Sequence, residues 1–262
     1  MKDFLAIDEN LRCAMQFFGN ASGSGDVEEV DGALGIFSGL DYGVFNIGLL
    51  TRPVTGRPGD LEARLKALGK FFGQRTLRWS VWLCEDMLDP AVRGRARQIF
   101  LNHGMRPISQ PPGMLAPALL PPSRVLPDIE MRPVRDVATR AAFSEVTSTN
   151  FEIPYTISRA VYSREQAWSG DYQGFVGFVG AQTAATVAIV PGAGSLGIYS
   201  LATMPAFRRK GYGEALLRAA ATEVARRSGL SRLILQSTDA GYSLYQRMGF
   251  REVTRFTVYL MK

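Results

Sequence analysis

The sequence predicts a protein of mixed α and β structure made of two halves. Three observations predict it. Strand-like and helix-like segments alternate in both halves, seven of the chain's 14 prolines fall within 107–127, and a glycine turn over 201–214 joins a strand to a helix. A content of 46% hydrophobic against 21% charged residues is enough for a packed core. Because a proline-rich stretch cannot form a helix or a central strand, we expect an extended linker at 107–127 and domains at 1–127 and 128–262.

The N-terminal half shows the order strand, helix, strand, helix. Its apolar segments are Phe45–Leu50 for the first strand, Leu61–Phe72 for the first helix and Trp79–Cys84 for the second strand, and a second helix begins near Pro90. The turn ahead of the first helix contains Pro58, which has no N–H group, and Asp60, a carboxylate that suits a helix N-cap. Both residues disfavour a bound phosphate at this turn.

The C-terminal half shows a longer alternation of elements. It begins with a strand and two helices and continues with a hairpin and one more strand, over 195–203. It ends with helix, strand, helix and strand. The helix that starts at Tyr212 stops at Gly229, because glycine accepts the left-handed conformation that commonly ends a helix. The expected ranges are 129–134, 135–150, 154–163, 174–180, 184–190, 195–203, 212–228, 231–236, 241–248 and 250–260.

The glycine turn between the expected strand 195–203 and the expected helix 212–228 has the features of an anion-binding site. Gly211 and Gly213 let the backbone approach a ligand without a Cβ in the way. The start of a helix leaves about four N–H groups without internal partners, and the helix dipole favours negative charge there. Arg208, Arg209 and Lys210 add three cations. The expected ligand carries a phosphate or pyrophosphate.

Two motifs narrow the choice of ligand. A dinucleotide site would need a third glycine where Leu216 stands, and no P-loop pattern occurs. The turn instead reads L-x-T-x-P followed by R-x-x-G-x-G, and the later segment 233–250 ends L-Y-x-x-x-G-F. Together the two motifs resemble the acyl-CoA signature of the GNAT N-acetyltransferase superfamily over 128–262. The resemblance implies a GNAT fold, with a mixed, mostly antiparallel sheet flanked by helices.

The weaker order of elements in the N-terminal half resembles a degenerate GNAT-like copy that binds no coenzyme A, which would make the chain a tandem; an unrelated α/β domain is the alternative. In the C-terminal half the resemblance implies acetyl-CoA as co-substrate. Many relatives have an asparagine where Thr238 stands, so Ser237 or Thr238 would have to replace that contact. The residues implied to bind the co-substrate are Leu201, Ala202, Thr203, Arg208, Arg209, Lys210, Gly211, Tyr212, Gly213, Glu214, Thr238 and Tyr245.

The resemblance places a general-acid tyrosine at Tyr245, with Tyr242 as a nearby competitor. A tyrosine has a pKa near 10 and stays protonated at neutral pH, so it can donate a proton to a leaving thiolate, whose thiol pKa is about 8.5. The general base is left open. Some relatives carry a carboxylate where Gly197 stands, so Glu145, Glu152 and a water relay remain candidates.

The expected function is therefore acetyl-CoA-dependent N-acetyl transfer to a primary amine of a small molecule or peptide. The alternatives are a non-catalytic acyl-CoA-binding regulatory module, favoured by the missing strand carboxylate, and a transferase of a longer acyl or an aminoacyl group. The acceptor amine is not determined by the sequence.

Composition excludes other classes. Residues 128–262 hold 16 Lys and Arg against 11 Asp and Glu, which places most of the net charge of +6 beside the anion site. No basic helix or aromatic-interleaved basic stripe favours nucleic acid. His103 is the only histidine, so neither a metal site nor a histidine-based mechanism is expected. No run of about 18 apolar residues predicts a membrane span. Cys13 and Cys84 form no disulfide framework, so we expect a cytoplasmic protein, monomer or homodimer.

Overall fold

The computed structural model describes residues 2–75 and 77–261, and it divides the chain into two compact units. The N-terminal unit runs to Met114 and also contains Gln236–Ala240 and the segment from Glu252 onward. The C-terminal unit contains Leu115–Leu235 and Gly241–Arg251. The last strand is therefore part of the N-terminal unit, although we expected it in the C-terminal domain. The division of roles between domains 1–127 and 128–262 stays a prediction.

The N-terminal unit is built on a sheet in which β1, β2, β3, β4 and β12 follow one another, with β5 on β12. Strands β3 and β4 are parallel, and the other pairs among these strands are antiparallel. The strands are β1 Asp26–Val30, β2 Ala33–Phe37, β3 Ile47–Leu50, β4 Ser80–Cys84, β5 Met105–Ser109, β6 Pro112–Ala116 and β12 Arg251–Met261; the helices are α1 Asp3–Ala21, α2 Asp60–Gly73, α3 Pro90–Arg93 and α4 Ala96–Asn102, with a 3₁₀ turn at Glu85–Met87.

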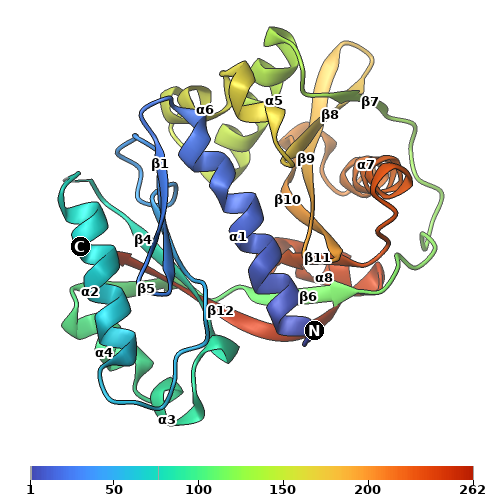
Figure 1. Cartoon of the computed structure of the whole chain (residues 1–262). Coiled ribbons are helices and arrows are strands. Elements are labelled where there is room, and N and C mark those ends of the chain that lie inside the picture. The colour runs from blue at the N-terminus through green and yellow to red at the C-terminus, as the bar shows by residue number, and fades with distance from the viewer. Residues whose placement is uncertain (1, 76, 262) are drawn as a thin grey trace. The chain divides into compact units, whose positions relative to one another are not determined.

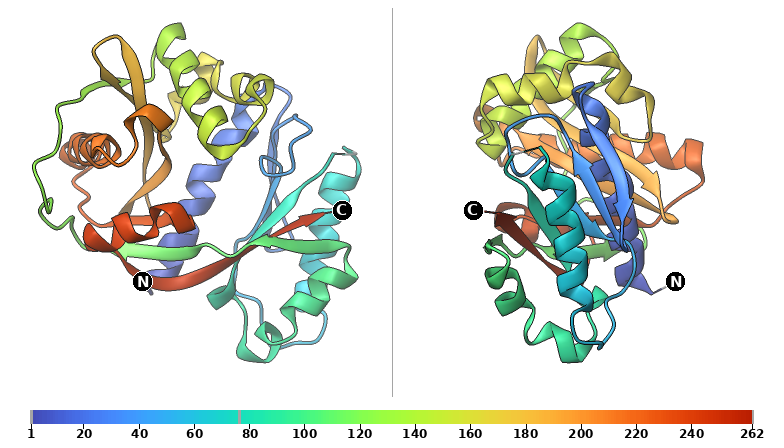
Figure 2. Two further views of the ribbon diagram at one scale, coloured as in Figure 1. Left: turned by 180° about the vertical axis from the view of Figure 1, so that it is seen from behind. Right: turned by 60° about the vertical axis from the view of Figure 1, so that its left-hand side comes forward.

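Helices α1 and α2 cover opposite faces of this sheet (Figures 1 and 2). Neighbouring strand residues show the alternation: a Cβ added at Gly35 would meet the ring of Phe71 from α2 at 2.6 Å, whereas Ile36 lies against Gly19 of α1. Because side chains alternate across a strand, the two helices each take one face. The sheet core is thus closed on both sides.

The predicted elements of the N-terminal half are all present, with two differences. The helix expected from Pro90 is two short helices, α3 and α4, separated at Gly94. The first part of the proline-rich stretch forms strands β5 and β6, which the prediction of an extended linker excluded. Proline is tolerated here because Pro112 is the first residue of β6 and Pro107 faces β12 at an irregularity in the register. Helix α1 and the β1–β2 hairpin were not predicted.

The C-terminal unit contains the strand order β11, β10, β9, β8, β7, as the GNAT fold implies. Only β10 and β11 are parallel within it. The strands are β7 Glu130–Pro133, β8 Gln173–Val179, β9 Gln182–Gly192, β10 Ser195–Thr203 and β11 Leu233–Gln236; the helices are α5 Val137–Phe151, α6 Tyr155–Tyr162, α7 Tyr212–Ser228 and α8 Asp239–Arg247, with 3₁₀ turns at Glu165–Ser169 and Pro205–Phe207.

Local rules account for the helix ends of this unit. Helix α5 begins with a capping box in which Asp136 accepts from the Thr139 amide at 2.7 Å, and α7 ends at Gly229 with φ 72°, as predicted. Helices α5 and α7 lie on opposite sides of β8–β10 (Figures 1 and 2). None of the helices formed by the described residues is both long and apolar enough to cross a bilayer.

Candidate functional site

The turn between β10 and α7 presents a row of backbone amides. Gly211 is the N-cap of α7 and has φ 98°, a conformation that glycine adopts without strain. Among residues 2–75 and 77–261, no group accepts a hydrogen bond from the amides of 209–214. No side chain caps the helix either. The N-terminus of a helix of 17 residues is therefore left with the polar groups that an anion can bind.

Both glycines of the turn are also required by close packing within the chain. A Cβ at Gly213 would lie 2.6 Å from Oγ1 of Thr203, and a Cβ at Gly211 would lie 2.9 Å from Cδ of Pro127 and 3.3 Å from the Arg124 guanidinium. The space beside each glycine is thus filled by the protein itself. The glycines bring the helix start against strand β10 and against the linker at 124–127.

The basic residues of the turn are exposed, and two of them hold its shape. Arg208 donates from Nε to the Thr203 carbonyl at 3.2 Å and from its NH2 group to Asn150 Oδ1 at 2.8 Å. Lys210 Nζ donates to the Ala206 carbonyl at 2.8 Å. Arg209 has φ 60°, a left-handed conformation that costs a non-glycine residue free energy. These contacts fix the positive charges around the free amides.

The acidic residue of the turn does not oppose an anion. Glu214 is 8% exposed, and its Oε1 accepts from the NH2 group of Arg218 at 2.8 Å. The ion pair joins residues one helical turn apart, so the negative charge of Glu214 is neutralised within α7. Tyr212, beside it, packs edge-on against Phe207 with ring centroids 5.6 Å apart.

Strand β10 bends at a bulge just before Leu201–Thr203. The register with β9 shifts between Tyr199 and Ala202, and Ser200 has φ 48°. Its Oγ lies 2.8 Å from the hydroxyl of the buried Tyr172, and its carbonyl accepts from Thr186 Oγ1 at 3.0 Å. A strained residue persists only where its surroundings hold it, and these hydrogen bonds do so.

The edge of β10 opens beyond this bulge. The ladder between β10 and β11 consists of the pairs Leu196–Leu233 and Gly197–Ile234, so β11 does not cover 198–203. On its other edge, β10 continues to pair with β9 as far as Thr203 with Ala185. Leu201, Ala202 and Thr203, the predicted co-substrate contacts on β10, therefore lie on a strand segment that β11 leaves without a partner on one edge.

Tyr245 lies in a dry environment within the C-terminal unit. The side chain is 8% exposed and packs edge-on against Phe250, with ring centroids 5.6 Å apart. Burial raises its pKa above the ordinary value of 10, and no described residue is hydrogen-bonded to its hydroxyl. The competitor Tyr242 is half-buried, and its hydroxyl accepts from Gln246 Nε2 at 3.2 Å.

The other candidates are placed with mixed results. Glu145 and Glu152 are both exposed, and Thr238 is exposed within the N-terminal unit, beside the buried Ser237. Their roles stay predictions. Trp168 and Tyr172, which are not among the predicted site residues, belong to an aromatic cluster with Phe143, Tyr162 and Tyr199, and this favours a packing role for them. Within the described ranges, no three His, Cys, Asp or Glu side chains are grouped to hold a metal.

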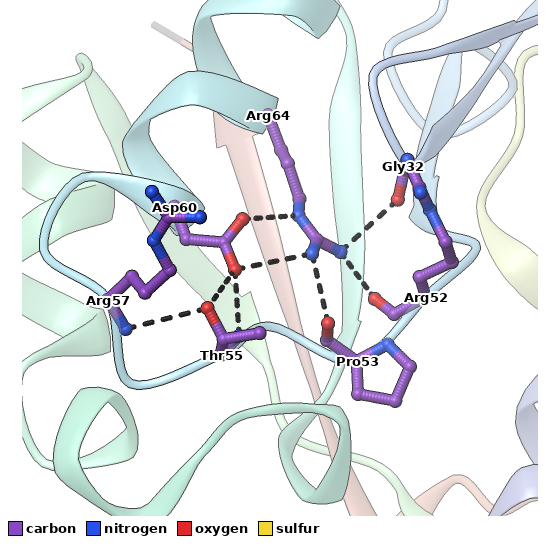
Figure 3. A network of polar contacts seen from close by, with 7 residues as sticks. All are labelled: Gly32, Arg52, Pro53, Thr55, Arg57, Asp60 and Arg64. Carbon is purple, nitrogen blue, oxygen red and sulfur yellow. Dashed lines mark hydrogen bonds and ion pairs between the residues drawn. The ribbon is translucent and has the colours of Figure 1, made fainter.

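The corresponding turn of the N-terminal unit, between β3 and α2, contains its own anion (Figure 3). Asp60 Oδ2 accepts from the Thr55 amide at 2.8 Å and from Thr55 Oγ1 at 2.7 Å. Arg64 donates to Asp60 Oδ1 at 3.1 Å and to the Pro53 carbonyl at 2.9 Å, and it also binds the carbonyls of Arg52 and Gly32.

The charge of Asp60 is favoured by these partners. Although burial would raise its pKa, hydrogen bonds from Thr55 and Arg64 lower the pKa of Asp60 from its ordinary value. We expected Asp60 to cap helix α2, and that was wrong. The N-cap is Gly59, with φ 83°, and the Asp60 carboxylate binds the preceding turn instead of the helix amides.

The same turn also closes the gap beyond β3 and β4. The buried Val54 forms a parallel bridge with Leu88, donating to the Met87 carbonyl at 2.8 Å and accepting from the Asp89 amide at 3.1 Å. In this unit the chain's own backbone therefore occupies the strand edge that stays unmatched beside β10.

A further difference escaped our reading of the sequence. Helices α4 and α8 end alike, because His103 and Met248 donate to the fourth residue before them, and Gly104 and Gly249 follow with positive φ. Counting back from the glycine, Phe100 stands where Tyr245 stands in the second copy. The glycine stop was the signal that aligns them. Phe100 has no hydroxyl to donate a proton.

The chain is similar to known acetyltransferases. Residues 163–252 match the family model of the acetyltransferase (GNAT) domain. A GCN5-related N-acetyltransferase from Kribbella flavida shares 19% identity over 97% of this chain and 95% of its own, with a TM-score of 0.69. Another from Sphaerobacter thermophilus shares 17% identity over 88% and 80%, with a TM-score of 0.57. No curated protein matches the sequence.

A third structure bears on the two-unit organisation. A tandem GNAT protein from the clavulanic acid biosynthesis pathway shares 12% identity over 87% of this chain and 77% of its own, with a TM-score of 0.56. Identities this low establish the fold alone. The segment 163–252 matches the acetyltransferase (GNAT) domain, within a chain that has the fold of GNAT proteins almost throughout.

Proposed function

We propose that the C-terminal unit is an acetyl-CoA-dependent N-acetyltransferase that acts on a primary amine. The observation that carries the proposal is the turn before α7, where the amides of 209–214 are without partners and lie among three exposed cations. This arrangement suits the diphosphate of coenzyme A, because backbone N–H groups, the helix dipole and positive side chains all favour negative charge.

The opened edge of β10 supports the same ligand. The amide groups of a pantetheine arm can pair with Leu201–Thr203 as an added strand would. This pairing would hold the thioester beside the bulge at Ser200, and a backbone N–H of Ala202 or Thr203 would donate to the carbonyl oxygen as negative charge develops on it. Positioning of amine and thioester can contribute roughly 7–11 kcal/mol at most.

Tyr245 is the proposed general acid. The acceptor nitrogen attacks the thioester carbonyl, the C–S bond breaks, and the phenol proton passes to the leaving sulfur. Burial keeps the tyrosine protonated at neutral pH, so that a proton is available for the leaving thiolate, and it also makes the phenol a weaker acid than a free tyrosine. The acceptor amine loses its proton to Glu145 or Glu152, which are both exposed, or to water.

A non-catalytic acyl-CoA-binding module is the second candidate, because Gly197 stands where some relatives carry a carboxylate. Incubating the full chain with labelled acetyl-CoA and a panel of primary amines and peptides separates the two. Label transferred to any amine, and lost in a Tyr245→Phe variant, supports the enzyme. Tight acetyl-CoA binding without transfer to any member of the panel supports the module.

Calorimetry tests the binding site directly. Gly211→Glu would collide with Pro127, so the charge is better reversed at the exposed Lys210. We expect Lys210→Glu to weaken acetyl-CoA binding by about tenfold or more, as the loss of a charge-assisted contact implies. Arg226→Glu makes the same charge change in the last turn of α7, where the side chain is 71% exposed, and should bind as the wild type does.

The outcome that would reject the site is equally clear. If the wild-type chain gives no heat with millimolar acetyl-CoA or free coenzyme A, the turn does not bind the diphosphate. If Lys210→Glu and Arg226→Glu weaken binding equally, the effect comes from net charge alone. In both cases the role of Tyr245 loses its basis.

A further inference from the structure

The N-terminal unit contains a cavity that the proposed acetyl transfer does not use. It has a volume of about 480 Å³ and lies between helices α3–α4 and the strands β4, β12 and β5. Leu83, Leu88 and Ala96 form buried apolar parts of its wall. This size is within the range of about 300–1,000 Å³ that is typical of small-molecule sites.

The wall of the cavity contains a carboxylate, that of Glu85, whose orientation is fixed by a hydrogen bond. Oε1 of Glu85 accepts from Thr257 Oγ1 at 2.8 Å, and Thr257 in turn accepts from Gln110 Nε2 at 3.3 Å. All three residues line the cavity, and Thr257 is buried. The bond fixes the side chain of Glu85 and uses one of its two oxygens, so the carboxylate can still accept from a ligand.

A cation without an ion-pair partner among the described residues also lines the cavity. Arg93 and Arg97 both line the cavity, but Arg93 is paired with Asp86 at 2.9 Å. Arg97 is not within ion-pair distance of any carboxylate of the described residues. An arginine guanidinium offers a planar fork of donors that matches a carboxylate in two parallel hydrogen bonds.

Tyr259 lines the same cavity as Glu85 and Arg97. Its ring stacks on Phe100 with centroids 3.8 Å apart, which fixes the side chain against the cavity wall. Burial raises its pKa, the charge of Glu85 raises it further and the charge of Arg97 lowers it. Both charges therefore act on the same hydroxyl from within the cavity, and they have opposite sign.

The cavity is separate from the gap beyond β3 and β4 that Val54 closes. None of its lining residues comes from β3 or from the turn at 51–59. In that turn Val54 pairs with Leu88, and Thr55 donates to Asp60. It is also built within one unit, because its residues come from the chain before Met114 and after Glu252. The last strand supplies Thr257 and Tyr259, so the cavity exists only because β12 joins this sheet.

We propose that this cavity binds a small zwitterion, namely an apolar α-amino acid or a dipeptide of such residues. Its ammonium group contacts Glu85, its carboxylate contacts Arg97, and its side chain lies against Leu83, Leu88 and Ala96. Thr257 orients Glu85, and Tyr259 is fixed in the same wall by Phe100. The inference does not depend on acetyl transfer, since the ligand, the residues and the unit are different.

The test uses L-leucine and L-leucyl-L-leucine as probes with the full chain. Binding is followed by saturation-transfer NMR and by the shift in unfolding temperature at millimolar ligand. N-acetyl-L-leucine, which lacks the ammonium group, and L-leucinamide, which lacks the carboxylate, are the matched ligand controls. We expect at least one of the two zwitterions to bind, and each control to bind about tenfold or more weakly, because each loses one charged contact.

Protein variants complete the test. Arg97→Gln and Glu85→Gln should each weaken binding of the zwitterion about tenfold, whereas Arg95→Gln, an exposed residue two positions from Arg97 that does not line the cavity, should leave it unchanged. Circular dichroism confirms that the variants fold. The proposal is overturned if neither zwitterion binds when it is present at about 10 mM and about 20-fold molar excess over the protein. It is also overturned if Arg97→Gln weakens binding of the zwitterion no more than Arg95→Gln does.

Discussion

Two strand–turn–helix segments of this chain share one scaffold and differ in what fills it. In both, a strand is parallel to the next one in sequence, the helix starts after a glycine with positive φ, and a second helix ends at another such glycine. At the start of α2, the Asp60 carboxylate accepts a hydrogen bond from the Thr55 amide. Before α7, the amides of 209–214 have no partner in the described chain. One turn carries an internal anion, and the other is the turn at which we propose that an external anion binds.

The strand edges differ in the same sense. Val54 bridges to Leu88 in the first segment, whereas β11 stops short of 198–203 in the second. The position of Tyr245 is taken by Phe100 in the first copy. Each difference falls on one part of the proposed acyl-transfer site: the phosphate cradle, the strand edge and the proton donor. The comparison teaches that one scaffold can satisfy the polar groups of a turn and a strand edge with the protein's own groups in one unit and leave them without partners in the other.

The largest expected effect is on the tyrosine that distinguishes the copies. Tyr245→Phe should lower kcat by about 10² to 10⁴-fold, the usual contribution of a general acid, and leave acetyl-CoA affinity nearly unchanged. Steady-state kinetics and calorimetry measure the two quantities. Tyr242→Phe is the matched control and should retain most of the activity. The roles would have to be exchanged if Tyr242→Phe were the inactive variant.

The second effect is on the stability of the internally satisfied turn. Arg64→Met removes the donor that binds Asp60 and three backbone carbonyls (Figure 3), and Arg64 is only 6% exposed. The free energy of unfolding should fall by about 2 kcal/mol, because a partly exposed carboxylate and three backbone carbonyls lose their shared donor. Arg57→Met, at an exposed site in the same turn, should change it by less than about 0.5 kcal/mol. Urea unfolding followed by circular dichroism measures both, and equal losses would show that the network does not hold the turn.

The smallest effect is a pH dependence that should be missing. The folded-state pKa of Tyr245 is raised by burial, so its proton is retained to higher pH than in a free tyrosine. The acetylation rate should rise with pH as more of the amine loses its proton, and it should show no falling limb below about pH 10. A wild-type rate that falls between about pH 9 and 10, as it would if a tyrosine with the ordinary pKa of about 10 lost its proton, would contradict the dry environment of Tyr245.

Much of the fold could be predicted because its signals are local. The spacing of apolar residues in α2 and α7, the glycine that ends α7 and the turn that joins β8 to β9 each act within a few residues. The glycine turn before α7 was recognised for the same reason. Asp60 was singled out as unfavourable for phosphate, which stays a prediction. Its partner was misjudged, since a carboxylate at a helix start can turn back to the preceding loop as readily as cap the helix.

The sequence by itself determined where the helix start with free amides lies, since glycine spacing and basic residues act locally at 208–214. Only the tertiary structure decided that β12 completes the N-terminal sheet, that Val54 closes one strand edge and that Ser200 is held at a bulge by Tyr172. These features depend on hydrogen bonds between segments far apart in the chain. Strand pairing and side-chain packing across such distances are set by which partners are brought together in space, and no local spacing of residues encodes them.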